Sequence, residues 1–108
     1  MKLFGREVKF LFSMDARFRI NEIDKDASDD ERLVKTALIM ANAYDNRQKF
    51  LDPKYENKKP LTEEEIKMLN PGEWGELCEA ISDATLEGLK VSVEVEGGKK
   101  KEDKTKSN

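Results

Sequence analysis

The chain has 108 residues, of which 40% are charged and 37% are hydrophobic, and its formal net charge is −3. This size and composition fit one small domain with a modest core. Histidine is absent and Cys78 is the only cysteine, which excludes an internal disulfide, a Cys–His nucleophile pair and the usual zinc sites. We therefore expect a protein that is not an enzyme and holds no cofactor.

The distribution of apolar and charged residues argues against membranes and nucleic acids as partners. No apolar run approaches the roughly 20 residues that span a bilayer, and charged residues interrupt Met1–Phe12, where a signal peptide would need an apolar stretch. We expect a cytoplasmic protein. Residues 97–108 hold five lysines and two acids, a charge of +3, so the other residues sum to −6. Such an acidic body is unsuited to specific nucleic-acid binding.

The first predicted element is a β-hairpin within Leu3–Phe12. Gly5-Arg6 is a glycine-first pair typical of a two-residue type II′ turn. Apolar residues then alternate with others with a period of two, which indicates a strand with one buried face: Val8, Phe10 and Phe12.

Two helices follow. Ser13 is the expected N-cap of a helix from Met14 to about Lys25. Ser28 and the glutamate three residues later form a capping box, which predicts a helix from Asp29 to around Lys49. The second helix carries a broad apolar stripe and should be the centre of the core: Leu33, Val34, Ala37, Leu38, Ala41 and Tyr44.

A polar connector, residues 52–60, separates this helix from two more. Thr62 begins a second capping box and a short helix. Asn70 followed by Pro71 predicts the N-cap and first position of the last helix, which should end near Glu87 with Gly88 as its C′ residue.

The last predicted element is a strand over residues 89–96, where valines return to a period of two. A lone strand is unstable, so this strand should pair with the amino-terminal hairpin. The sequence thus predicts a mainly helical α+β domain over residues 1–96, with about four helices and a small antiparallel sheet. Residues 97–108 hold no apolar side chain, and we expect a disordered lysine-rich tail.

Clusters of acids are the remaining candidates for chemistry. Asp24 and Asp26 resemble the start of a calcium loop, but Asp29 stands where glycine is required and Lys35 where glutamate is required. Glu63, Glu64 and Glu65 suit the first turn of a helix, where the helix dipole favours acids. We therefore expect no metal site and no catalytic carboxylate pair.

Four apolar or aromatic residues are candidates for binding a partner protein. Phe50, Leu51 and Tyr55 flank the connector and are either an exposed contact patch or a small cluster packed under the loop. Trp74 is either a partner anchor or a core residue. Lys99, Lys100 and Lys101 in the tail either touch nucleic acid weakly or only aid solubility.

Several segments resemble the tail assembly chaperones of long-tailed bacteriophages and related prophages. These are residues 5–14 (GREVKFLFSM), 61–66 (LTEEEI), 68–74 (MLNPGEW) and 97–101 (GGKKK). The resemblance covers most of residues 1–96 in order and spacing, and its motifs are loose. In that family, a Gly-Lys-Lys stretch can be encoded by an A-rich run at which a frameshift yields a longer product.

The resemblance implies a chaperone that coats the tape-measure protein and recruits tail-tube subunits, without catalytic residues. A small core is also compatible with self-association. The alternative is a small acidic phage or prophage regulator that binds a host protein. The two differ in the genes expected beside them, tail genes for the chaperone and early genes for the regulator.

Overall fold

The computed structural model describes the backbone of residues 1–97 and the side chains of residues 1–90. The elements of this part are β1 (Lys2–Leu3), β2 (Arg6–Glu7), α1 (Met14–Asn21), α2 (Asp29–Leu51), α3 (Glu63–Lys67) and α4 (Pro71–Gly97). The predicted class, a mainly helical α+β fold with a small antiparallel sheet, is confirmed. The predicted tail, apart from its first residue, lies outside the described residues.

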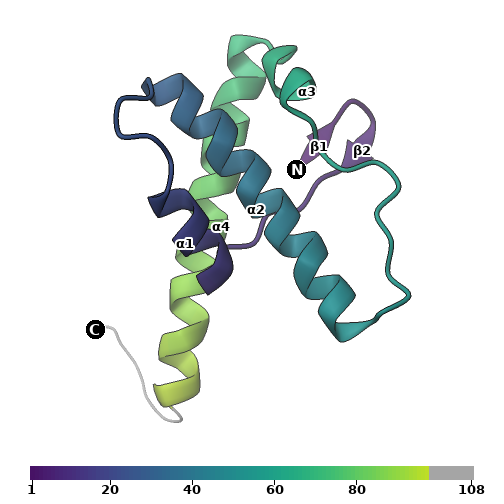
Figure 1. Cartoon of the computed structure of the whole chain (residues 1–108), viewed down its shortest axis with the longest axis vertical. Coiled ribbons are helices and arrows are strands. Elements are labelled where there is room, and N and C mark those ends of the chain that lie inside the picture. The colour runs from purple at the N-terminus through teal and green to yellow at the C-terminus, as the bar shows by residue number, and fades with distance from the viewer. Residues whose placement is uncertain (98–108) are drawn as a thin grey trace.

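Helix α2 is the centre of the arrangement. It crosses in front of α4 in Figure 1, with α1 on one side and the hairpin and connector on the other. The fully buried side chains Met40, Ile66 and Leu77 come from α2, α3 and α4 respectively. All four helices of the described chain contribute to the core, since Ala16 of α1 is also fully buried in it, and α2 supplies the largest share.

The four predicted N-caps are all present. The side chains of Ser13, Ser28 and Thr62 accept hydrogen bonds from backbone N–H groups three residues later. Asn70 and Glu73 bond reciprocally, side chain to backbone, at 2.8 and 2.9 Å. These bonds satisfy N–H groups that a helix leaves unpaired at its start. Helix α1 nevertheless ends at Asn21, short of the predicted Lys25.

The hairpin turn lies one residue earlier than predicted. Lys2 pairs with Glu7 and Leu3 with Arg6, so the turn residues are Phe4 and Gly5, with φ of 51° and 84°. The prediction of Gly5-Arg6 was wrong because this register buries Leu3, which is 2% exposed. A slip of one residue would turn Leu3 to the opposite face.

The predicted continuation of the hairpin to Phe12 is also wrong. The ladder ends at the pair of Lys2 and Glu7. The last such contact is the 2.7 Å hydrogen bond from the Val8 N–H to the Met1 carbonyl. The next residues cross the helices without strand structure, and the Leu11 N–H donates to the Met40 carbonyl at 3.0 Å.

The predicted strand over residues 89–96 is wrong, because α4 continues without a break to Gly97. Once a helix has formed, each added residue gains a backbone hydrogen bond, which outweighs the small helix penalty of valine. Gly88 is therefore inside the helix and is not its C′ residue. The small sheet of the described chain consists of the two hairpin strands alone.

Candidate protein-binding site

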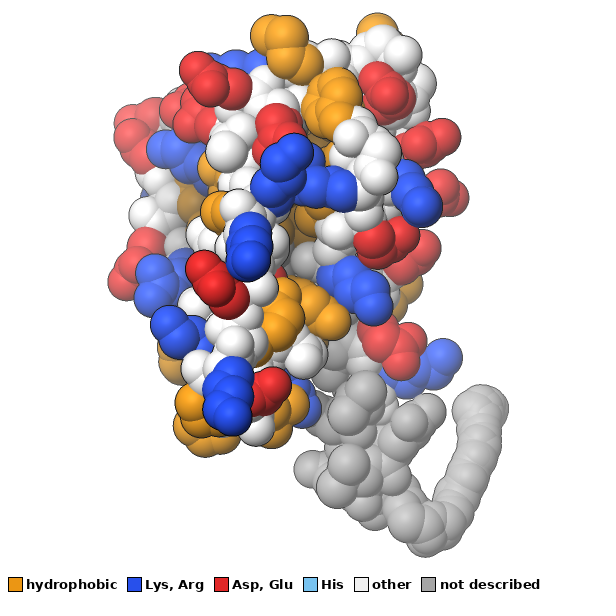
Figure 2. Space-filling view, turned by 90° about the vertical axis from the view of Figure 1, so that its right-hand side faces the viewer, with side chains coloured by type: hydrophobic (Ala, Val, Ile, Leu, Met, Phe, Trp, Pro, Cys, Tyr) orange, Lys and Arg blue, Asp and Glu red, His pale blue; other side chains and the backbone are white. Residues whose placement is uncertain are grey.

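The last turn of α2 exposes two large apolar side chains. Phe50 is 86% exposed and Leu51 is 65% exposed. The helix ends immediately after them because Pro53 pushes Asp52 out of helical geometry, and Asp52 is extended, with ψ of 99°. Apolar side chains gather at this lower end of the face shown in Figure 2. Phe50 and Leu51 thus form the exposed patch that was one of the two predicted alternatives.

Beside this patch, the surface between α1 and α2 is hollowed. The hollow has a volume of about 420 Å³, and we call it the α1–α2 groove. It is lined by Ser13, Asp15, Ala43, Asn46, Arg47, Phe50 and Leu51. The groove is open to solvent and wide enough to accept side chains of a docked helix.

Helix α1 adds two apolar groups that the sequence analysis did not select. Met14 and Phe18 are one turn apart on the same face, and they are 59% and 61% exposed. They lie opposite Ala16, the one fully buried residue of α1. The sequence does indicate this exposure. Helix α1 is short and has apolar residues on two opposite faces, and only one of these faces can pack against the core.

The charges on the groove are partly neutralised. Asp15 and Arg19 form an ion pair at 3.1 Å across one turn of α1. Arg47, by contrast, makes no ion pair with any described side chain. The groove therefore suits an apolar segment that also carries an acidic residue.

Tyr55 lies elsewhere and fastens the connector to α2. Its hydroxyl donates to Asp45 Oδ1 at 2.9 Å, and Asn57 Nδ2 donates to Asp45 Oδ2 at 2.9 Å. The hydrogen bond to Asp45 raises the pKa of Tyr55. Tyr55 is thus half-buried and held to α2 by a hydrogen bond, and it is separate from the exposed pair Phe50 and Leu51.

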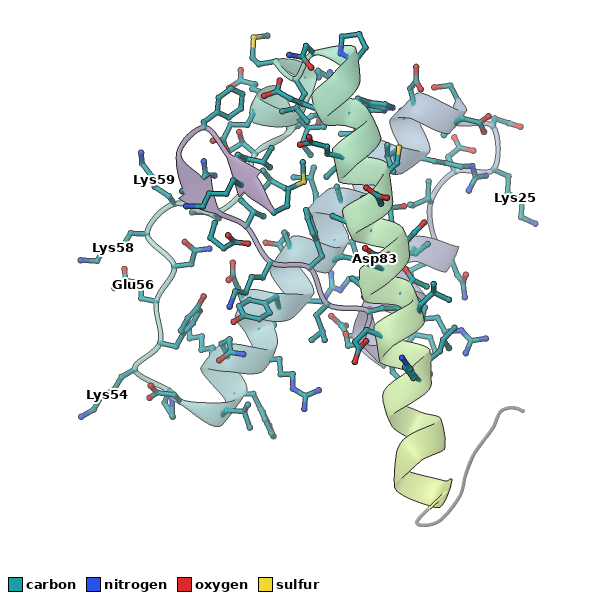
Figure 3. All side chains as sticks on the ribbon, turned by 180° about the vertical axis from the view of Figure 1, so that it is seen from behind. Lys25, Lys54, Glu56, Lys58, Lys59 and Asp83 are labelled. Atoms are coloured by element: carbon teal, nitrogen blue, oxygen red, sulfur yellow. The ribbon has the colours of Figure 1, made fainter. Side chains whose placement is uncertain are left out.

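The far end of the connector is fixed to the hairpin and to α3. The Arg6 guanidinium donates to both carboxylate oxygens of Glu65, at 2.5 and 2.8 Å, and its Nε donates to the Lys59 carbonyl at 3.3 Å. The hydrogen bond from Arg6 lowers the pKa of Glu65 to about 2. Between the two fixed ends, Lys54 and Lys58 point outward from the connector (Figure 3).

Trp74 is half-buried in the first turns of α4 and packs against the core. It lines a different hollow, with Val34 of α2 and Glu63 of α3. This hollow is lined by residues from the first turns of α2, whereas Phe50 and Leu51 are the last two residues of that helix. The structure therefore does not bring the four predicted residues together. Lys99, Lys100 and Lys101 lie outside the described residues.

The acids considered for chemistry have structural contacts. Asp24 Oδ1 accepts from the Asp26 N–H at 2.9 Å, Glu63 pairs with Lys67 at 2.8 Å, and Glu65 pairs with Arg6. Among the described side chains, no group of three or more Cys, Asp or Glu is placed to hold a metal ion. Within residues 1–97, no helix has both the length and the apolar character to cross a bilayer.

Comparison with protein-family models, with curated proteins and with solved structures finds no match to this chain.

Proposed function

We propose that this protein is a non-enzymatic phage tail assembly chaperone that binds the tape-measure protein and recruits tail-tube subunits in the bacterial cytoplasm. The observation that carries the proposal is the α1–α2 groove, with the exposed Phe50 and Leu51 at its end. The resemblance of the hairpin, the capped helices and the Gly-Lys-Lys stretch to that family supplies the identity of the partner.

The physical basis is recognition of a helix by a groove. A long helical partner with apolar stripes would place apolar side chains against Phe50 and Leu51, in the manner of an amphipathic helix in a hydrophobic groove. Ser13 and Asp15 of α1 would form the opposite wall of this contact. Each contact would bury a small area, so tight overall binding would come from many copies along one long partner.

A pull-down with the tape-measure and tail-tube proteins of its own genome tests the proposal. Wild-type protein should capture the tape-measure protein, and a Phe50→Ser/Leu51→Ser double variant should lose most of this capture. Met68→Ser is a matched control, because Met68 is 71% exposed at the end of α3, away from the groove. Failure of the wild-type protein to bind either partner would reject the proposed function.

The alternative, an acidic regulator that binds a host protein, draws support from α4. Glu76, Glu79, Asp83 and Glu87 are exposed at helical spacing along its outward face, and Figure 3 shows Asp83 on the solvent side of that helix. Such a ridge could imitate nucleic acid toward a basic host protein. Early genes on both sides of this gene would favour the regulator, and tail genes would favour the chaperone.

A further inference from the structure

A second hollow lies where the beginnings of three helices meet. It has a volume of about 320 Å³, and we call it the Trp74 groove. It is lined by Asp30, Glu31, Val34, Lys35, Glu63, Lys67 and Trp74. Trp74 offers a half-buried aromatic surface in this lining, and the buried Val34 lies beside it. Tryptophan is a common anchor residue at protein interfaces.

Two ion pairs form the walls of this groove. Glu31 and Lys35 are 3.7 Å apart on α2, and Glu63 and Lys67 are 2.8 Å apart on α3. The pKa of Glu63 is lowered, first by its bond to Lys67 and also by the charge of Lys35 on the opposite wall. The charges of the two walls therefore act on each other across the groove.

The charges of Lys35 and Lys67 are thus neutralised by Glu31 and Glu63 respectively. Asp30 makes no ion pair with any described side chain, which leaves the lining of the groove with one excess negative charge. Asp29 and Glu64, which are exposed neighbours in the first turns of α2 and α3, add to the negative field. An occupant has to bring apolar surface for Trp74 and positive charge for the rim.

We propose that the Trp74 groove is a docking site for a basic amphipathic helix of a partner protein. An apolar side chain of that helix, such as leucine, packs against Trp74. A lysine or arginine one turn away reaches Asp30 and Glu63, and its cation also benefits from proximity to the indole face. The proposal is independent of the proposed function, because the α1–α2 groove lies at the other end of α2 and carries Arg47, a cation with no ion pair among the described side chains.

A fluorescence titration with synthetic peptides tests this proposal on the full chain. Trp74 is the only tryptophan, so its emission reports directly on the groove. The probe is an amphipathic helical peptide made of leucine and lysine, and the control is a peptide of equal length made of leucine and glutamate, both free of tryptophan. The lysine peptide should shift the Trp74 emission saturably, and added salt should weaken its binding.

Charge-neutralising variants locate the binding. Asp30→Asn and Glu63→Gln should each weaken binding of the lysine peptide by roughly threefold. Asp83→Asn removes the same charge from the outward face of α4 and should have a much smaller effect. Because Asp30 makes no described ion pair, its variant should melt like the wild type and remain informative even if Glu63→Gln does not fold.

Three results would overturn the proposal. The first is the absence of any saturable change in Trp74 emission with the lysine peptide. The second is equal binding of the glutamate peptide, which would indicate unspecific apolar association. The third is equal weakening by Asp83→Asn and Asp30→Asn, which would indicate general attraction to an acidic protein.

Discussion

Gly88 lies directly against the backbone of Phe12. A Cβ atom at position 88 would be 2.6 Å from the Phe12 carbonyl oxygen and 3.2 Å from the Phe12 Cβ. The segment between the hairpin and α1 can cross α4 this closely only because residue 88 has no side chain. This contact fixes the path of the chain into α1, which forms one wall of the α1–α2 groove.

The first prediction concerns this contact. Gly88→Ala should lower the free energy of unfolding by about 1–2 kcal/mol, because the overpacking penalty exceeds the gain in helix propensity. Gly75→Ala is the matched control in the same helix, since nothing lies within 4 Å of a Cβ there. That variant should be neutral or stabilised by up to about 1 kcal/mol. Urea denaturation followed by circular dichroism measures both, and equal effects would contradict the prediction.

The second prediction concerns the pair of Arg6 and Glu65. Arg6→Gln should destabilise the protein by about 1–2 kcal/mol at neutral pH, since two charge-assisted hydrogen bonds and the tie to Lys59 are lost. Arg19→Gln is the control, because its ion pair with Asp15 is largely exposed and should contribute at most about 0.5 kcal/mol. Thermal melting of both variants compares the two effects.

This pair also predicts a pH dependence. The hydrogen bond from Arg6 lowers the folded-state pKa of Glu65 from its ordinary value of 4.5 to about 2. Its contribution to stability is therefore complete above the unfolded pKa and is lost as the pH falls from 4.5 toward 2. The difference in stability between the wild type and Arg6→Gln should shrink over this interval. A difference that stays constant down to the acid end would show that Glu65 is not held by Arg6.

The third prediction concerns Asp45 and the connector. Asp45→Asn replaces the carboxylate whose hydrogen bond and charge raise the pKa of Tyr55 above its ordinary value of 10.0, so this pKa should fall back toward 10.0. Spectroscopic titration in a Tyr44→Phe background isolates Tyr55, because the chain has two tyrosines. The freed connector should also be cut faster by trypsin at Lys54 and Lys58. Unchanged titration and cleavage would mean that Asp45 does not hold the connector.

The fourth prediction separates stability from binding at the α1–α2 groove. Phe50→Ser/Leu51→Ser should change the free energy of unfolding by less than about 0.5 kcal/mol per site, because both side chains are exposed. Leu77→Ala, at a position that is 0% exposed, should cost about 2–5 kcal/mol. Chemical denaturation gives both values. A large loss in the double serine variant would place these residues in the core and remove them from the binding argument.

The sequence alone determined the features that depend on residues a few positions apart. Each helix start was predictable because Ser13, Ser28, Thr62 and Asn70 bond to N–H groups three residues away. The central position of α2 followed from its apolar stripe. Phe50 and Leu51 were selected because they precede a proline-bounded connector, where no further helical turn can cover them.

The tertiary structure decided the features that depend on which other segments of the chain a residue contacts. The turn at Phe4 and Gly5 is set by the burial of Leu3, and the residues after Val8 leave the ladder and contact α2, where the Leu11 N–H donates to the Met40 carbonyl. The alternating valines of residues 89–96 suggested a strand, but α4 extends through them. Likewise, the sequence suggests Gly88 as the residue that ends a helix, but it lies inside α4, where Phe12 packs against it. Trp74 is separated from Phe50 by most of the length of α2. Local hydrogen bonds are encoded within a few residues, whereas register, close approach and the grouping of surface side chains depend on contacts between distant segments.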